Sequence, residues 1–125
     1  NSILRAKQQV IEQAIDKARE SIAGLNDEEY FNVLEKLLRK NVQQGKGKIC
    51  FSKKDLDRIP NGFEDRVKVI VAENQGELVI DKEPANIKDG FVLVYGEIEE
   101  NCTLKALFDS NIDRIKDIAN KQLFG

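Results

Sequence analysis

The chain has 125 residues, of which 20 are basic and 22 acidic, so its formal charge at pH 7 is −2. This length fits one domain with a single hydrophobic core, and the near-neutral charge gives no electrostatic footprint for nucleic acid or anionic lipid. No apolar run reaches the roughly 20 residues that a membrane-spanning helix needs, and the first residues lack the pattern of a signal peptide. We therefore expect a soluble, cytoplasmic protein.

Histidine is absent, which removes the commonest general base and the commonest metal ligand. The two cysteines, Cys50 and Cys102, lie too far apart in the sequence to form a zinc motif. We interpret them as reduced, buried thiols, with a disulfide between them as the alternative. We expect no catalytic residue, no metal and no cofactor.

Residues 3–24 contain no helix breaker and predict one long helix. Its apolar residues recur at the spacing of a heptad seam, namely Leu4, Ile11, Ile15, Ala18, Ile22 and Leu25. We interpret this seam as a partner-binding coiled coil; the alternative is a core helix of the same domain, because about three heptads barely favour a coiled coil. No N-cap precedes Ile3, so we expect the seam to continue in residues before Asn1. We accordingly divide the chain into the end of a coiled coil, residues 1–25, and a head, residues 26–125.

The head begins with a second predicted helix, residues 27–44. Asn26 is a good N-cap, and the carboxylates that follow it favour the first turn. Apolar residues cover a wide arc of this helix, which predicts a principal core helix.

The segment Gly45–Lys48 resembles a phosphate-binding loop, but Ile49 stands where that motif needs serine or threonine. We instead predict that the glycine ends the helix and that a short strand follows at residues 48–51. Ser52 and Asp55 then have the spacing of a capping box, and they begin a short helix that Pro60 ends.

The last third of the chain has the clearest pattern. An apolar run, Phe91–Tyr95, lies between Gly90 and Gly96 and predicts a strand buried on both faces. The alternating polarity around Ile98 predicts an edge strand with one solvated side. Thr103 is then a candidate N-cap for an amphipathic helix that extends to residue 123.

This stretch, from Gly90 to Phe108, resembles the C-terminal signature of the E subunits of V-type (archaeal and bacterial V/A-type) ATP synthases, the larger chain of the peripheral stalk. The residues that carry the resemblance are Gly90, Phe91, Gly96, Glu99, Glu100, Asn101, Cys102, Leu107 and Phe108. One residue departs from the family pattern: Asp89 stands where a second glycine is usual, so the backbone entering the strand is less free.

The resemblance implies an α+β fold, with an N-terminal coiled-coil helix followed by a compact domain. In that domain a roughly four-stranded mixed or antiparallel sheet is packed by helices. It also favours a helix at residues 63–74, whose valines fit strand and helix spacing equally. We predict strands at residues 48–51, 77–80, 90–95 and 97–102, covered by the helices at 27–44 and 103–123.

The resemblance further implies a non-catalytic stator subunit of a rotary ATPase. Its N-terminal helix would pair with the G subunit of the stalk, its head would contact the B subunit of the catalytic head, and it would meet the membrane only through the complex. Two alternatives remain: a stalk-like regulator of a flagellar or type III export ATPase, and a small enzyme. For the enzyme, Glu97, Glu99 and Glu100 are candidate acid–base groups and Cys102 a candidate nucleophile, although solvated turn carboxylates and a buried thiol explain them more simply.

Overall fold

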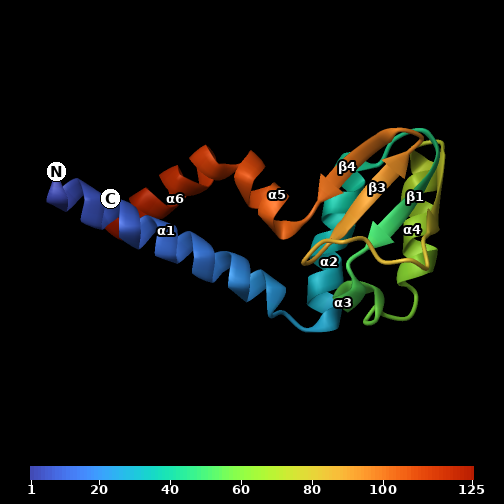
Figure 1. The fold of residues 1–125 in the computed structure, drawn as a ribbon, viewed down its shortest axis with the longest axis horizontal. Coiled ribbons are helices and arrows are strands. Elements are labelled where there is room, and N and C mark those ends of the chain that lie inside the picture. The colour runs from blue at the N-terminus through green and yellow to red at the C-terminus, as the bar shows by residue number, and fades with distance from the viewer.

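The computed structural model describes residues 1–125 and contains six helices and four strands (Figure 1). In chain order they are α1 (Ser2–Ala23), α2 (Asp27–Asn41), β1 (Gly45–Phe51), α3 (Lys53–Leu56), α4 (Phe63–Glu73), β2 (Gly76–Ile80), β3 (Phe91–Tyr95), β4 (Ile98–Cys102), α5 (Leu104–Ser110) and α6 (Ile112–Phe124). Figure 1 shows α1 and α6 extending away from the other elements. We call α1 with α6 the arm, and the elements from α2 to β4 the head.

The head is built on one four-stranded sheet with the strand order β2-β1-β3-β4. Strand β1 is parallel to β2 and antiparallel to β3, and β3 forms an antiparallel hairpin with β4. The parallel pair needs a long crossover, which α3 and α4 provide. Helices α2 and α4 cover one face of the sheet, and the core between them consists mainly of Tyr30, Phe31, Leu34, Leu38, Ile49, Phe51, Phe63, Val67, Ile70, Phe91 and Leu93.

The α+β class is confirmed, and so is a helix in the segment whose spacing was ambiguous. Helix α4 buries Phe63, Val67 and Ile70 on one side, while Val69 is exposed. The predicted caps also form: Asn26 Oδ1 accepts a hydrogen bond from the Glu29 amide (2.9 Å), and Thr103 Oγ1 accepts one from the Ala106 amide (3.0 Å). The prediction that no N-cap precedes Ile3 is wrong, because Asn1 Oδ1 accepts a hydrogen bond from the Leu4 amide (2.9 Å) and caps α1.

Two strand predictions need correction. Strand β3 is buried on one face only: Phe91 and Leu93 are fully buried, whereas Val92 and Val94 are half-buried. No helix covers the second face, so an apolar run was not sufficient to predict burial on both sides. Strand β1 starts at Gly45 and not at Lys48, because its first residues already pair with β2. Gly45 therefore does not end α2, which ends at Asn41 with Val42 as its C-cap.

The single helix predicted at residues 103–123 is wrong in two respects. It breaks at Asn111, whose side-chain amide donates to the Leu107 carbonyl oxygen (2.8 Å) and ends α5. Beyond the break, α6 leaves the sheet and runs back along α1 toward the start of the chain (Figure 1). The apolar stripe of α6 faces α1 and not the sheet, and α1 covers it only in part, since no residue of α6 is buried. No helix of the structure combines the length and the apolar character needed to cross a bilayer.

Candidate functional site

The predicted partner-binding seam of α1 divides into three environments. Leu4 is 56% exposed near the free end of the helix. In the middle, Ile11 is half-buried and Ile15 is buried, and Ala18 faces α6. At the other end, Ile22 and Leu25 pack against the core of the head. The helix is therefore anchored in its own head at one end; its apolar stripe is covered only in part by α6 in the middle and is exposed toward the other end.

A shallow groove of about 310 Å³ runs between α1 and α6, and we call it the arm groove. It is lined by Ala14, Ile15, Ala18, Ile115, Ile118, Ala119, Gln122 and Leu123, all apolar except Gln122. Near the end of α6, the Lys7 ammonium lies 5.2 Å from the ring centroid of Phe124, a favourable cation–π distance. The arm thus presents an apolar surface that its own two helices cover only in part.

The buried carboxylate of Asp55 connects α2, α3 and the start of β3 through hydrogen bonds. Asp55 of α3 is fully buried, and its Oδ2 accepts hydrogen bonds from the Tyr30 hydroxyl (2.5 Å) and the Gly90 amide (2.7 Å). Arg58 Nε lies 3.7 Å from Asp55 Oδ1, and the Arg58 guanidinium stacks 4.1 Å from the centroid of the Tyr30 ring. Burial, and then the hydrogen bond to Asp55, raise the pKa of Tyr30 far above its usual value. These contacts link α2, α3 and the start of β3.

Sequence reasoning missed this role of Asp55. The Ser52–Asp55 spacing predicted a capping box, and the Asp55 amide does donate to Ser52 Oγ (3.2 Å). The reciprocal bond is not made, because the Ser52 amide donates to the Gly90 carbonyl oxygen instead (3.0 Å). The Asp55 carboxylate is therefore free to point into the core. This outcome depends on Gly90, which is distant in the sequence, and local spacing does not reveal it.

Most residues of the family signature form the β3–β4 hairpin and its connection to α5. Gly90, Phe91, Cys102 and Phe108 are buried, Leu107 and Glu100 are half-buried, and Gly96, Glu99 and Asn101 are exposed. Gly90 has a φ of +74°, and a Cβ placed on it would collide with the Cys102 carbonyl oxygen. Some signature residues are therefore explained by packing in the core, whereas others are polar and lie on the surface.

We expect Gly90→Ala to lower the free energy of unfolding by about 3 kcal/mol. Left-handed backbone costs a non-glycine residue roughly 1–2 kcal/mol, and the clash with the Cys102 carbonyl group adds about 1–3 kcal/mol. Gly96→Ala is the matched control, because Gly96 also has a positive φ (+62°) but has open space around it. Urea unfolding of both variants tests this expectation, and equal losses in the two would show that the close approach at Gly90 is unimportant.

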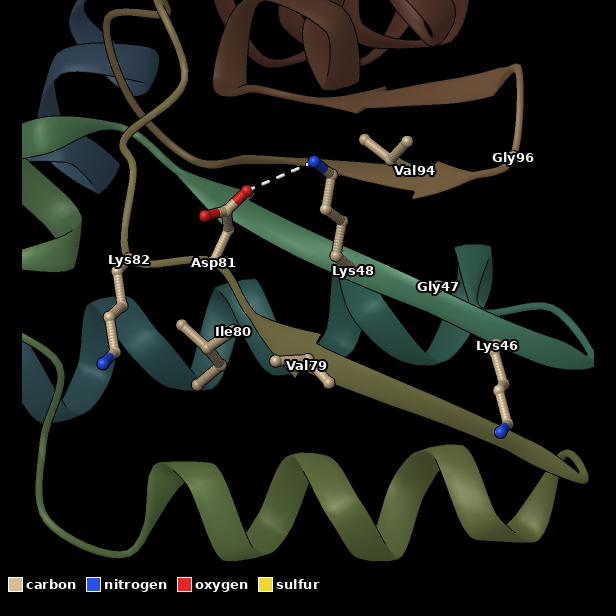
Figure 2. A pocket seen from close by; sticks show the side chains of 9 residues that line it. All are labelled: Lys46, Gly47, Lys48, Val79, Ile80, Asp81, Lys82, Val94 and Gly96. Atoms are coloured by element: carbon tan, nitrogen blue, oxygen red, sulfur yellow. Dashed lines mark ion pairs between the residues drawn. The ribbon is translucent and has the colours of Figure 1, made fainter.

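The second face of the sheet carries no helix, and we call it the open face. A hollow of about 670 Å³ on it is lined by Lys46, Gly47, Lys48, Val79, Ile80, Asp81, Lys82, Val94 and Gly96. Figure 2 shows Lys48 and Asp81 turned toward each other, with Lys46 and Lys82 at opposite ends of the hollow. Lys48 Nζ lies 3.3 Å from Asp81 Oδ2. The Glu83 amide, and then the Lys48 ammonium, hold the pKa of Asp81 below its usual range.

The open face suits a protein contact better than a phosphate ligand. Lys46 and Lys48 lie on a regular strand and not on a loop whose amides converge. The valines beside them, of which Val79 is 68% exposed, supply apolar area among charges of both signs. Such a mixture is typical of surfaces that bind another protein without being permanently buried.

The two thiols are free and lie on opposite sides of the sheet. Cys102 belongs to the core, whereas Cys50 Sγ lies 3.7 Å from Asp81 Oδ2 of the open face, and β3 separates their strands. Burial, helped by Glu100, raises the pKa of Cys102 to about 12, and burial, helped by Asp81, raises the pKa of Cys50. A nucleophilic cysteine needs a lowered pKa, so neither thiol has the environment that the enzyme alternative requires.

Comparison with known proteins confirms the family resemblance. No protein-family model matches the chain. The E subunit of a V-type ATP synthase from Acetivibrio thermocellus is 29% identical over 103 residues, which are 81% of this chain and 52% of the relative. The V-type ATP synthase E subunit of Clostridium botulinum strain Hall is 30% identical over 126 residues, and the V-type proton ATPase E subunit of C. botulinum strain 657 is 31% identical over 131 residues. Each of these two alignments covers 99% of this chain and 63% of the relative. The chain therefore spans between one half and two thirds of these relatives.

Proposed function

We propose that this chain, a relative of the E subunits of V-type ATP synthases, works as a peripheral-stalk component of a V-type rotary ATPase. In that role it is a non-catalytic strut that holds the catalytic head against rotation while ion transport is coupled to ATP synthesis or hydrolysis. The observation that carries the proposal is the similarity, at about 30% identity over 99% of the chain, to proteins named as E subunits of V-type ATP synthases or proton ATPases. The complex would keep the chain peripheral to the membrane.

The arm and the head fit the two attachments that a strut needs. We assign the arm to the G subunit, the smaller stalk chain, because the apolar surface of the arm is incompletely covered. We assign the head, from α2 to β4, to the B subunit of the catalytic part of the motor, with contact through the open face. That face is modest in size and mixed in character, so a single contact should be weak. A stalk tolerates weak contacts, because it is tethered at both ends and each attachment raises the local concentration of the other.

Calorimetric titration of the chain, alone and with the G subunit, against the purified B subunit tests this proposal. We expect Val79→Glu on the open face to weaken binding of the B subunit by about tenfold or more, because it places a charge in the contact. Val69→Glu is the matched control: Val69 is similarly exposed (58%, against 68% for Val79) but lies on α4, which covers the other face of the sheet. The proposal is wrong if the chain binds a flagellar or type III export ATPase but does not bind the B subunit, even when the G subunit is present. The chain would then be a regulator of the export ATPase.

A further inference from the structure

We propose that the free edge of β4 binds an extended segment of another chain as an additional antiparallel strand of the sheet, and that this segment alternates basic and apolar residues. The site consists of the edge of β4 and a hollow beside it, and it is separate from the arm groove and from the hollow of the open face. The inference goes beyond the proposed function and does not depend on it.

The backbone of β4 presents free hydrogen-bonding groups along its outer edge. β4 is the last strand in the order β2-β1-β3-β4 (Figure 1). The Ser52 amide donates to the Gly90 carbonyl oxygen, and because the bonds of an antiparallel strand alternate between its two neighbours, the odd-numbered residues of β3 bond to β4. The register of the hairpin then directs the backbone of Glu100 to β3 and leaves the N–H and C=O groups of Glu99 and Asn101 pointing outward. Both residues are exposed, and neither makes a backbone hydrogen bond outside the sheet.

A hollow of about 490 Å³ lies beside this edge, between α2, β4 and α5. Its apolar residues include Leu37 of α2 and Ala106 and Leu107 of α5, and the charges of Lys40 and Glu100 within it are opposite in sign. Successive side chains of a strand point to opposite faces of a sheet, so every second side chain of an added strand enters this hollow. An apolar side chain of moderate size, such as valine, fits there better than a charged one.

The charge of the edge selects the other residues of the added strand. The turn and β4 together carry Glu97, Glu99 and Glu100 and no basic residue. None of these glutamates belongs to an ion pair of the structure. Glu99 lies opposite Val94 in the register, so its side chain is on the open face. A lysine or arginine beside it in the added strand forms a favourable cross-strand pair.

A second copy of this chain does not suit the same edge. Antiparallel pairing of two β4 edges brings the glutamates of both copies together, and like charges on adjacent strands are destabilising. Charged residues on an edge strand are a common protection against such self-pairing. They exclude an acidic strand, whereas a basic strand is attracted.

Two short peptides of equal length test the inference against the full chain. One alternates lysine with valine, and the other alternates glutamate with valine. We expect the lysine peptide to bind at least about tenfold more tightly, and its binding to slow hydrogen exchange of the Glu99 and Asn101 amides, which gain acceptors. Val79→Glu, the variant that tests the contact with the B subunit, should leave peptide binding unchanged. Failure of the proposed function and failure of this inference are therefore distinguishable.

N-methylated peptides test whether the backbone forms the contact. A residue that pairs with Glu99 shares its face and directs its own N–H group toward β4. N-methylation of the lysines should therefore weaken binding by about tenfold or more. N-methylation of the valines, whose N–H groups point away from β4, is the matched control and should have little effect.

Variants of the chain test the same edge from the other side. Asn101→Pro removes an outward N–H group, a position where an edge strand accepts proline, and should weaken binding of the lysine peptide by about tenfold or more. Asn101→Ala keeps the amide and should bind as the wild type does. Glu99→Lys should reduce the preference for the lysine peptide, whereas Glu12→Lys, the same charge change at an exposed position of α1, should not.

Equal binding of the lysine and glutamate peptides, or unchanged exchange at Glu99 and Asn101, would overturn the inference. Equal effects of the two N-methylations would overturn it as well, and this comparison uses the wild-type chain, so it holds even if Asn101→Pro impairs folding. Self-association of the chain that Asn101→Pro abolishes would also contradict it, because a second copy would then occupy the edge.

Discussion

Replacement of Asp55 by leucine is expected to lower the free energy of unfolding by about 3–5 kcal/mol, the usual cost of removing one partner from a buried charged network. The change leaves the Tyr30 hydroxyl and the Gly90 amide without their acceptor. It also removes the only buried carboxylate near Arg58, whose Nε and Nη2 are themselves buried without a hydrogen bond. Since a domain is stable by only about 5–15 kcal/mol, this is a large fraction of the total. Urea unfolding followed by circular dichroism measures it.

Two further variants test whether the loss of stability depends on the burial of the Asp55 carboxylate. Asp57→Ala removes a carboxylate from the same short segment, but that carboxylate is exposed and pairs only with Lys53, so we expect a loss below about 1 kcal/mol. Asp55→Asn keeps one oxygen acceptor and should fall between the other two. A loss for Asp55→Leu no larger than that for Asp57→Ala would contradict the central role given to this carboxylate.

Elements that depend on local chemistry were predictable from the sequence. The caps at Asn26 and Thr103 form as their residue types indicate, because a side-chain oxygen and an amide three residues later are close in any helix start. The hairpin between Gly90 and Cys102 is also local, since Gly96 allows the positive φ that its tight turn requires.

The location of α6 was not predictable in this way. Its amphipathic stripe shows that one side must be covered, but a stripe does not specify which surface covers it. The choice depends on the break at Asn111 and on the complementary stripe around Ile15, which lies about a hundred residues earlier in the chain. A prediction based on spacing therefore placed this helix on the sheet.

The partner seam shows the same limit. Its heptad spacing was real, but the structure uses Ile22 and Leu25 to hold α1 to the head and leaves Leu4 exposed. Similarly, the apolar run of β3 did not reveal that its valines belong to an open face. Spacing identified the residues that need a partner, whereas only the fold shows which of them already have one.

Ion pumping by a reconstituted V-type motor tests the stator role most directly. Vesicles containing the motor are prepared with the full chain, without it, and with the chain added back, and ATP hydrolysis and ion uptake are measured together. Without a stator the catalytic head turns with the shaft, so we expect ATP hydrolysis to continue while ATP-driven ion uptake falls by about tenfold or more. Adding the chain back should restore uptake. Ion uptake that remains unchanged when the chain is absent would contradict the account.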